Sequence, residues 1–294
     1  MKKHSLLIIA AAAFWGVMGI FSRTLEGMGL KTLETAALRI IWAALILVVI
    51  ILIKDRSIFK IRLRDLPLLA AIGVISIFAM SVFYLNAISS ASMSVAAILL
   101  YTAPFFVTAA SAFIYKEKIT FKTVTALLLA FLGCVLIAGI GGHTTSLGLF
   151  YGIMAGITYA SYSIFGKKAL EKYSPYTVTV WAFMFAALSA VIAVNPVSVV
   201  KSLVNSGATA VFITAMMGLV TAVIPFLLYT AGLSHTDAGK ASVMATAEPM
   251  VATLAGLIVF REIPGPVSVL GILLVVFAIA LLNNFGRQSK TAQG

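Results

Sequence analysis

The residue best suited to chemistry is Glu248, which stands within the stretch KASVMATAEPMVATLAGLIVF at positions 240–260. An ionised carboxylate is costly in such apolar surroundings unless it is paired, protonated or hydrated. Pro249 follows it and cannot donate to the carbonyl of Ala245, so a free backbone acceptor is expected one turn before the carboxylate. Glu248 is therefore expected to contact a substrate or exchange a proton. The alternative is a neutral structural acid beside a helix kink.

A second charged residue, Arg39, also interrupts a long apolar segment. At 1.5 Å per residue, Arg39 and Glu248 lie about 9 Å and about 14 Å from opposite faces of the membrane. In a hydrocarbon core about 30 Å thick, their Cα atoms then differ by about 7 Å in depth, which an arginine side chain can cover. The two residues are expected to form an ion pair or a coupling pair that faces a cavity. Alternatively, Arg39 reaches outward to the lipid headgroups.

Aromatic and polar residues deep in other apolar segments form a third group. Four aromatic residues lie away from the membrane interface, where Trp and Tyr are common: Trp15, Tyr84, Tyr101 and Tyr159. They are expected to form an amphipathic cavity wall, to which Asn86 adds a donor and an acceptor. Packing is the alternative for each aromatic residue, and a hydrogen bond between helices is the alternative for Asn86. Pro104 and Pro249 are expected to bend their helices beside this cavity.

The composition indicates which elements position these residues. Hydrophobic residues make up 62% of the chain, charged residues only 10%, and the mean hydropathy is +1.10. A soluble domain of this length could not bury so much apolar surface, so an all-α integral membrane protein in contact with the lipid bilayer is predicted. Ten segments have the length and apolarity of membrane-spanning helices: 5–22, 33–53, 66–88, 93–115, 121–140, 148–166, 176–194, 208–233, 239–260 and 266–285.

The charge distribution predicts how the chain crosses the membrane. Of the 21 Lys and Arg residues, sixteen fall on the side of the N-terminus and four on the other side. Because basic residues gather on the cytoplasmic side, both termini are predicted to be cytoplasmic in a cell membrane. The net charge of +12 lies in short clusters between apolar segments, which argues against a nucleic-acid partner. The first apolar segment resembles a signal peptide, but it continues past Ala13, which favours an uncleaved span.

An internal repeat is the most informative pattern in the sequence. A shift of 145 positions aligns Tyr84 with Tyr229, Pro104 with Pro249 and Glu117 with Glu262. Each half, 1–144 and 145–294, then holds five spans, and an odd number makes the second half enter the membrane inverted. Inverted repeats are typical of secondary transporters with a site near the midplane. Because Ala103 occupies the place of Glu248, that carboxylate is not required by the architecture of both halves.

The sequence resembles the EamA-type members of the drug/metabolite transporter superfamily. The resemblance rests on AAAFWGVMGIFSRTLEGMGLKTLETAALRIIWAALIL, with Trp15, Gly16 and Arg39, and on two segments that carry a proline and a terminal glutamate. It implies export or exchange of small metabolites such as amino acids by alternating access, without a cofactor or a metal. A channel or lipid scramblase with a polar interior is the alternative. An enzyme is disfavoured because the chain has no HExxH or GxSxG motif. Monomer and homodimer both remain open.

Overall fold

The computed structural model describes residues 3–139 and 144–283 of the 294-residue chain. Its described residues form a bundle with ten helical segments that are long and apolar enough to cross a membrane. The predicted all-α fold with ten transmembrane helices is therefore confirmed. The predicted span ends at 140 and 285 lie outside the described residues.

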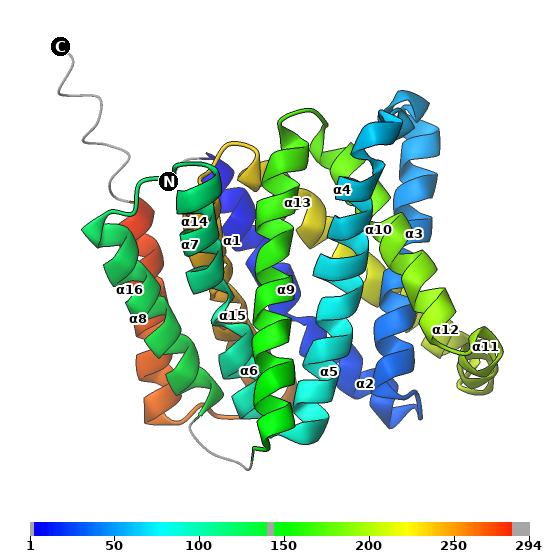
Figure 1. Cartoon of the computed structure of the whole chain (residues 1–294). Coiled ribbons are helices and arrows are strands. Elements are labelled where there is room, and N and C mark those ends of the chain that lie inside the picture. The colour runs from blue at the N-terminus through cyan, green and yellow to red at the C-terminus, as the bar shows by residue number, and fades with distance from the viewer. Residues whose placement is uncertain (1–2, 140–143, 284–294) are drawn as a thin grey trace.

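The first five spans run from blue to green in Figure 1. In chain order they comprise α1 (Lys3–Gly16) with α2 (Met18–Gly27); α3 (Thr32–Lys54); α4 (Leu66–Ala71), the π-helical η3 (Ile72–Ala79) and α5 (Met80–Ser90); α6 (Met93–Leu100) with α7 (Ala103–Ile114); and α8 (Phe121–Ala138). Two short 3-10 turns, η1 (Arg56–Phe59) and η2 (Leu63–Asp65), connect α3 to α4.

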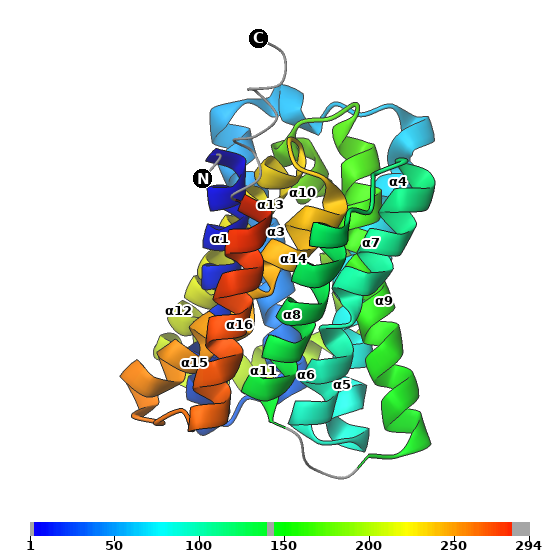
Figure 2. The ribbon, with the colours of Figure 1, turned by 90° about the vertical axis from the view of Figure 1, so that its left-hand side faces the viewer.

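The second five spans follow the same plan. They comprise α9 (Ser146–Leu170); α10 (Pro175–Ala193); α12 (Gly207–Gly218), the π-helical η4 (Leu219–Val223) and α13 (Ile224–Leu233); α14 (Ala238–Ala245) with α15 (Ala247–Phe260); and α16 (Pro266–Asn283). A short helix between spans, α11 (Pro196–Asn205), lies at the edge of the bundle (Figure 1). In Figure 2, α8 and α16 run side by side, and their glycines Gly133 and Gly271 allow close backbone contact.

Helix irregularities recur at the spacing of the sequence repeat. A shift of 145 positions superimposes the bounds of α6 on those of α14, and those of α8 on those of α16. Both third spans contain a π-helical segment, and both fourth spans are interrupted just before the aligned prolines. The left-handed residues Lys116 (φ 54°) and Arg261 (φ 58°) also match at this spacing. Figure 1 shows that α6 leads to α7 in the direction opposite to that from α14 to α15.

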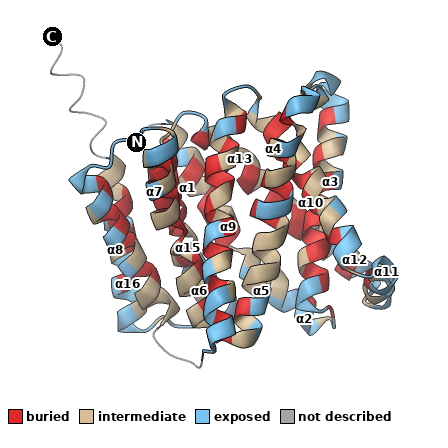
Figure 3. Cartoon of the chain, in the orientation of Figure 1, coloured by how far each residue is buried: buried red, intermediate tan, exposed pale blue. Residues whose placement is uncertain are grey.

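The distribution of buried residues fits a bundle surrounded by lipid. Figure 3 shows buried residues concentrated between the helices and exposed ones on the outside, where Phe277, for example, is 58% exposed. Apolar side chains on that surface avoid water only if acyl chains cover them. The end of the bundle where α1 begins and α16 ends is called the terminal end below, and the other is called the opposite end.

Candidate functional site

A cavity of about 100 Å³ brings together five of the predicted residues. Trp15, Arg39, Tyr84, Tyr159 and Glu248 all line it, and they come from α1, α3, α5, α9 and α15. The remaining lining residues are mainly apolar, among them Met18, Met80, Leu100 and Phe226. Two opposite charges in an otherwise apolar chamber form a site that can orient an amphipathic molecule. This chamber is called the central cavity below.

Close helix packing positions Glu248 in this cavity. The residue is the second of α15, directly after the interruption at Thr246. The helix α1 reaches it through Gly16, because a Cβ atom on Gly16 would come within 2.8 Å of the Glu248 carbonyl oxygen. The Glu248 side chain is half-buried and is close enough to Arg39 and to the Tyr159 hydroxyl to interact electrostatically with both. The carboxylate is thus fixed by its backbone and open to the cavity.

Among the residues that the structure describes, Arg39 is buried without a carboxylate partner. It is 6% exposed, its Nη1 donates to the Thr221 carbonyl at 3.4 Å, and it contacts the Met18 Sδ at 3.7 Å. Its buried Nε has no hydrogen-bond partner among the described residues. Thr221 lies in η4, and Pro225, four residues further on, has no N–H to donate to the Thr221 carbonyl, which leaves this acceptor available. The guanidinium therefore keeps donors that can bind an anionic group.

No direct ion pair joins Arg39 to Glu248 in the described chain, since none of its pairs with N–O distances of 4.0 Å or less involves either residue. The two side chains nevertheless share the central cavity. Two separated opposite charges match a ligand that carries both an ammonium and a carboxylate group, because each charge would then be paired.

Aromatic rings separate the central cavity from a smaller one of about 20 Å³ on the side of the terminal end. Trp15, Tyr159 and Phe226 line both cavities. The ring centroids of Trp15 and Phe226 are 5.2 Å apart in an edge-to-face arrangement, which is favourable for aromatic pairs. The Tyr229 hydroxyl lies 2.7 Å from Ser163 Oγ beside the smaller cavity. Its repeat equivalent, Tyr84, lines the central cavity instead.

Two predicted residues lie outside this lining. Asn86 donates from Nδ2 to the Val82 carbonyl of its own helix at 2.8 Å and lines a separate cavity between α3, α5 and α10. This placement corresponds neither to the central cavity nor to a hydrogen bond between helices. Tyr101 packs beside an apolar cluster that includes Cys134 and Ala247, although its hydroxyl remains within electrostatic reach of Glu248.

The predicted prolines stand next to the helix interruptions. Pro104 is the second residue of α7, and Pro249 is the third residue of α15. Since proline lacks an N–H and clashes with the preceding turn, it favours a break at this point. Leu100, which ends α6, lines the central cavity, whereas its equivalent Ala245, which ends α14, lines the smaller one. The residues just before the two interruptions, which correspond in the repeat, therefore line different cavities.

Phe226, Met18 and Met80 line the central cavity but were not predicted from the sequence. Apolar residues inside apolar spans carry no signal of their own. The internal repeat gives no signal for Phe226 either, because its equivalent Ser81, which also lines the cavity, carries none in the sequence.

Comparison with known proteins identifies the family. A model of the EamA-like transporter family matches residues 2–139 and again residues 146–284. The chain belongs to the EamA-like transporter family. An uncharacterized transporter of Clostridium kluyveri is 24% identical over 99% of this chain and 95% of its own length. An uncharacterized transporter of Archaeoglobus fulgidus is 29% identical over 89% of this chain and 91% of its own.

Two further matches concern a named substrate and the fold. A probable terminal-alkyne amino-acid exporter of Streptantibioticus cattleyicolor is 24% identical over 91% of this chain and 89% of its own length. A crystal structure that is 18% identical superimposes with a TM-score of 0.81 and covers 99% of both chains. At that identity the superposition shows the fold alone. As an EamA-like transporter, the protein is a multi-pass membrane protein and not an enzyme.

Proposed function

We propose that this EamA-like transporter exports a small zwitterionic, amphipathic metabolite of the amino-acid class across the cell membrane by alternating access. The observation that carries the proposal is the pair of separated charges in the central cavity, Arg39 and Glu248. In the proposed complex, the ammonium group of the substrate meets Glu248 and its carboxylate meets the guanidinium group of Arg39. The apolar body then lies against rings and thioethers such as Phe226 and Met80.

Alternating access is supported by the unequal size of the two cavities. Two pairs of residues that match in the repeat line opposite chambers: Tyr84 and Leu100 line the chamber of about 100 Å³, whereas Tyr229 and Ala245 line the chamber of about 20 Å³. If the halves 1–144 and 145–294 exchange their conformations, the small chamber enlarges and the large one collapses. With both termini in the cytoplasm, the structure then corresponds to a state with its larger chamber toward the outside.

A substrate panel in proteoliposomes tests this function. Saturable counterflow is measured with an apolar amino acid, the amine that lacks its carboxylate, and the acid that lacks its ammonium. We expect the zwitterion to be preferred by about tenfold or more, since each analogue leaves one cavity charge unpaired. Arg39→Gln should reduce the preference for the zwitterion over the amine, because the amine lacks the carboxylate that Arg39 would bind. Asn86→Ala, in the separate cavity, serves as the control. Non-saturable flux, or lipid movement without counterflow, would instead favour a channel or scramblase.

A further inference from the structure

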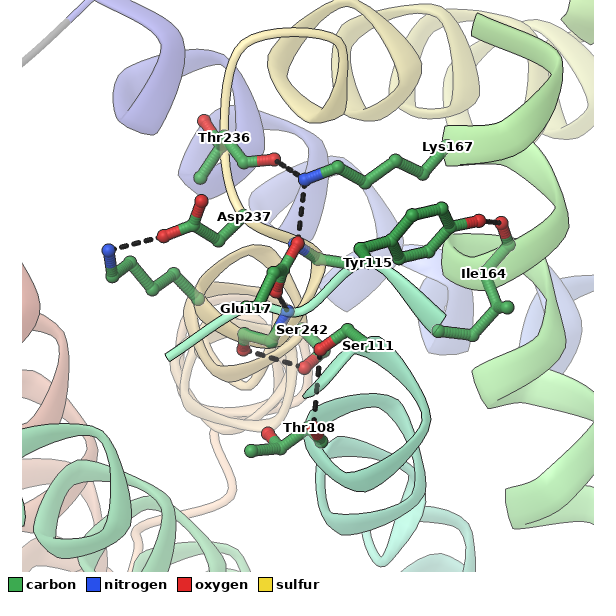
Figure 4. Close-up of polar contacts among 12 residues, drawn as sticks. Thr108, Ser111, Tyr115, Glu117, Ile164, Lys167, Thr236, Asp237 and Ser242 are labelled. Carbon is green, nitrogen blue, oxygen red and sulfur yellow. Dashed lines mark hydrogen bonds and ion pairs between the residues drawn. The ribbon is translucent and has the colours of Figure 1, made fainter. Parts of the chain in front are cut away.

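An ion pair joins the two halves at the terminal end. The Lys167 Nζ, from the end of α9, lies 2.7 Å from Glu117 Oε1, just beyond α7. The same lysine donates to the Thr236 carbonyl at 2.9 Å (Figure 4). Both side chains are largely buried, with exposures of 24% for Lys167 and 13% for Glu117. Screening by solvent is therefore weaker here than for a surface pair.

The Glu117 carboxylate also binds the start of α14. Its Oε1 accepts from the Ala238 backbone N–H at 2.9 Å, and its Oε2 accepts from the Gly239 N–H at 3.3 Å. The first N–H groups of a helix have no partner within the helix and carry partial positive charge, so a carboxylate at this point is stabilising. Glu117, Lys167 and the N-terminus of α14 are called the terminal clasp below. It joins the first half to the second through both a side chain and a backbone.

The adjoining tyrosine supports this contact. The Tyr115 hydroxyl donates to the Ile164 carbonyl at 2.5 Å, and the Lys167 Nζ lies 5.8 Å from the centroid of the Tyr115 ring.

A matching clasp lies at the opposite end, but it is incomplete. Arg23 Nη1 lies 2.6 Å from Glu262 Oε1, and the Arg23 guanidinium lies 4.7 Å from the centroid of the Phe260 ring. Glu262 and Phe260 are the repeat equivalents of Glu117 and Tyr115, and Arg23 matches Lys167 at a shift of 144. Here both charged side chains are more than half exposed, at 53% and 55%.

The missing part of this second clasp is the helix N-terminus. The equivalents of Ala238 and Gly239 are Met93 and Ser94 at the start of α6. Within the described ranges, no hydrogen bond joins Glu262 to α6, and the Val95 N–H is capped instead by Ser92 Oγ at 3.3 Å. The helix α14 packs along α7, whereas α6 and α15 have no comparable contact.

We propose that Glu117 and Glu262 capture helix N-termini in alternation: Glu117 holds α14 when the terminal end is closed, and Glu262 holds α6 when the opposite end is closed. The structure has the first clasp complete and the second released from its helix. Opening the terminal end then requires Glu117 to leave α14. The alternation rests on the proposed transport cycle, but the contacts that it predicts do not involve the substrate.

Matched cysteine pairs test this proposal in the full-length protein with Cys134→Ala. Ser111→Cys with Gly239→Cys reports the terminal clasp, because a Cβ atom on Gly239 would lie 3.6 Å from Ser111 Oγ. Ser94→Cys with Gly256→Cys is the equivalent pair at the opposite end, 145 positions away. Mild oxidation in membranes should cross-link the first pair and leave the second mostly free.

Glu117→Gln should then shift the cross-linking from the first pair to the second by about fivefold or more, because it removes a charge-assisted contact. Glu171→Gln is the control, since Glu171 pairs with Lys168 on the surface of the same end. Lys167→Gln provides a second variant with the same expected shift. Elution as a single monodisperse peak in gel filtration identifies the variants that are folded.

Unchanged cross-linking in both Glu117→Gln and Lys167→Gln, or an equal response in Glu171→Gln, would overturn the proposal. Because the assay needs no substrate, normal transport by a Glu248→Gln variant would count against the proposed function alone.

Discussion

At the level of the single side chain, Glu248 is the residue on which transport is expected to depend most. Glu248→Gln preserves the shape of the side chain and removes its charge, so an ammonium group loses its partner in the central cavity. We expect counterflow to fall by about tenfold or more, the factor that about 1.4 kcal/mol of lost interaction produces. Glu248→Asp should have a milder effect. Normal rates for folded Glu248→Gln would identify Glu248 as a structural acid.

Tyr101 is expected to act through both its ring and its hydroxyl. Tyr101→Ala removes a ring that packs beside Cys134 and Ala247, and we expect it to lower the free energy of unfolding by about 3 kcal/mol. Tyr101→Phe keeps the ring, so its melting temperature in detergent should match that of the wild type. Counterflow by both variants, measured beside the melting temperatures, separates packing from contact of the hydroxyl with the substrate. Equal melting temperatures for all three proteins would contradict the packing role.

Single residues differ in how much of their role the sequence could predict. Arg39 and Glu248 could be predicted because a charge in an apolar span is costly, so it requires a partner or a function. The sequence could not show that Asn86 lies outside the central cavity. An amide within a helix can bind a carbonyl group of the same helix, as Asn86 does at Val82, and therefore needs no partner in a cavity. Depth in the membrane gave no information on which way the side chain points.

At the level of the element, the contact between α1 and α15 is expected to control the position of Glu248. Gly16→Ala would place a methyl group 2.8 Å from the Glu248 carbonyl oxygen and 2.7 Å from Val251 Cβ, so the two helices must separate. We expect transport to fall by about tenfold, since small misplacement of a binding group is costly. Gly19→Ala is the control, because a Cβ atom there meets nothing within 4 Å.

Counterflow by the two glycine variants, at equal amounts of folded protein in the membrane, provides the measurement. Equal rates would show that the close approach at Gly16 does not position the carboxylate.

Most ends of the helices were predicted closely, because Gly, Pro and charged residues mark them. The first and sixth spans, predicted to end at 22 and 166, continue to Gly27 and Leu170. The interruptions at the aligned prolines could also be expected from the missing N–H of proline. The π-helical segment η3 could not, because nothing distinguishes the apolar stretch IGVISIFA from ordinary helix. For η4 there was a signal, since Pro225 follows two residues after it and cannot donate to the Thr221 carbonyl.

At the level of the whole molecule, the distribution of basic residues predicts the orientation in the membrane. The segment from Lys54 to Asp65, which contains five basic residues, should lie in the cytoplasm together with Lys3. Single cysteines in a Cys134→Ala background would be treated with an impermeant maleimide in intact cells. We expect Ser57→Cys to be protected and Ser198→Cys, between spans on the other side, to be labelled. The reverse pattern would contradict the predicted orientation and place the larger chamber toward the cytoplasm.

The π-helical segments also have a consequence for chain length. A π turn holds about one residue more than an α turn, so deleting Ala222 or Val223 from η4 should restore regular helix while keeping the phase of the flanking helices α12 and α13. The span would keep its place in the bundle, but the Phe226 N–H, in place of Pro225, would then stand four residues after Thr221 and bind its carbonyl, and Arg39 would lose its acceptor. A one-residue gap within an otherwise continuous span would therefore mark relatives that hold this arginine differently.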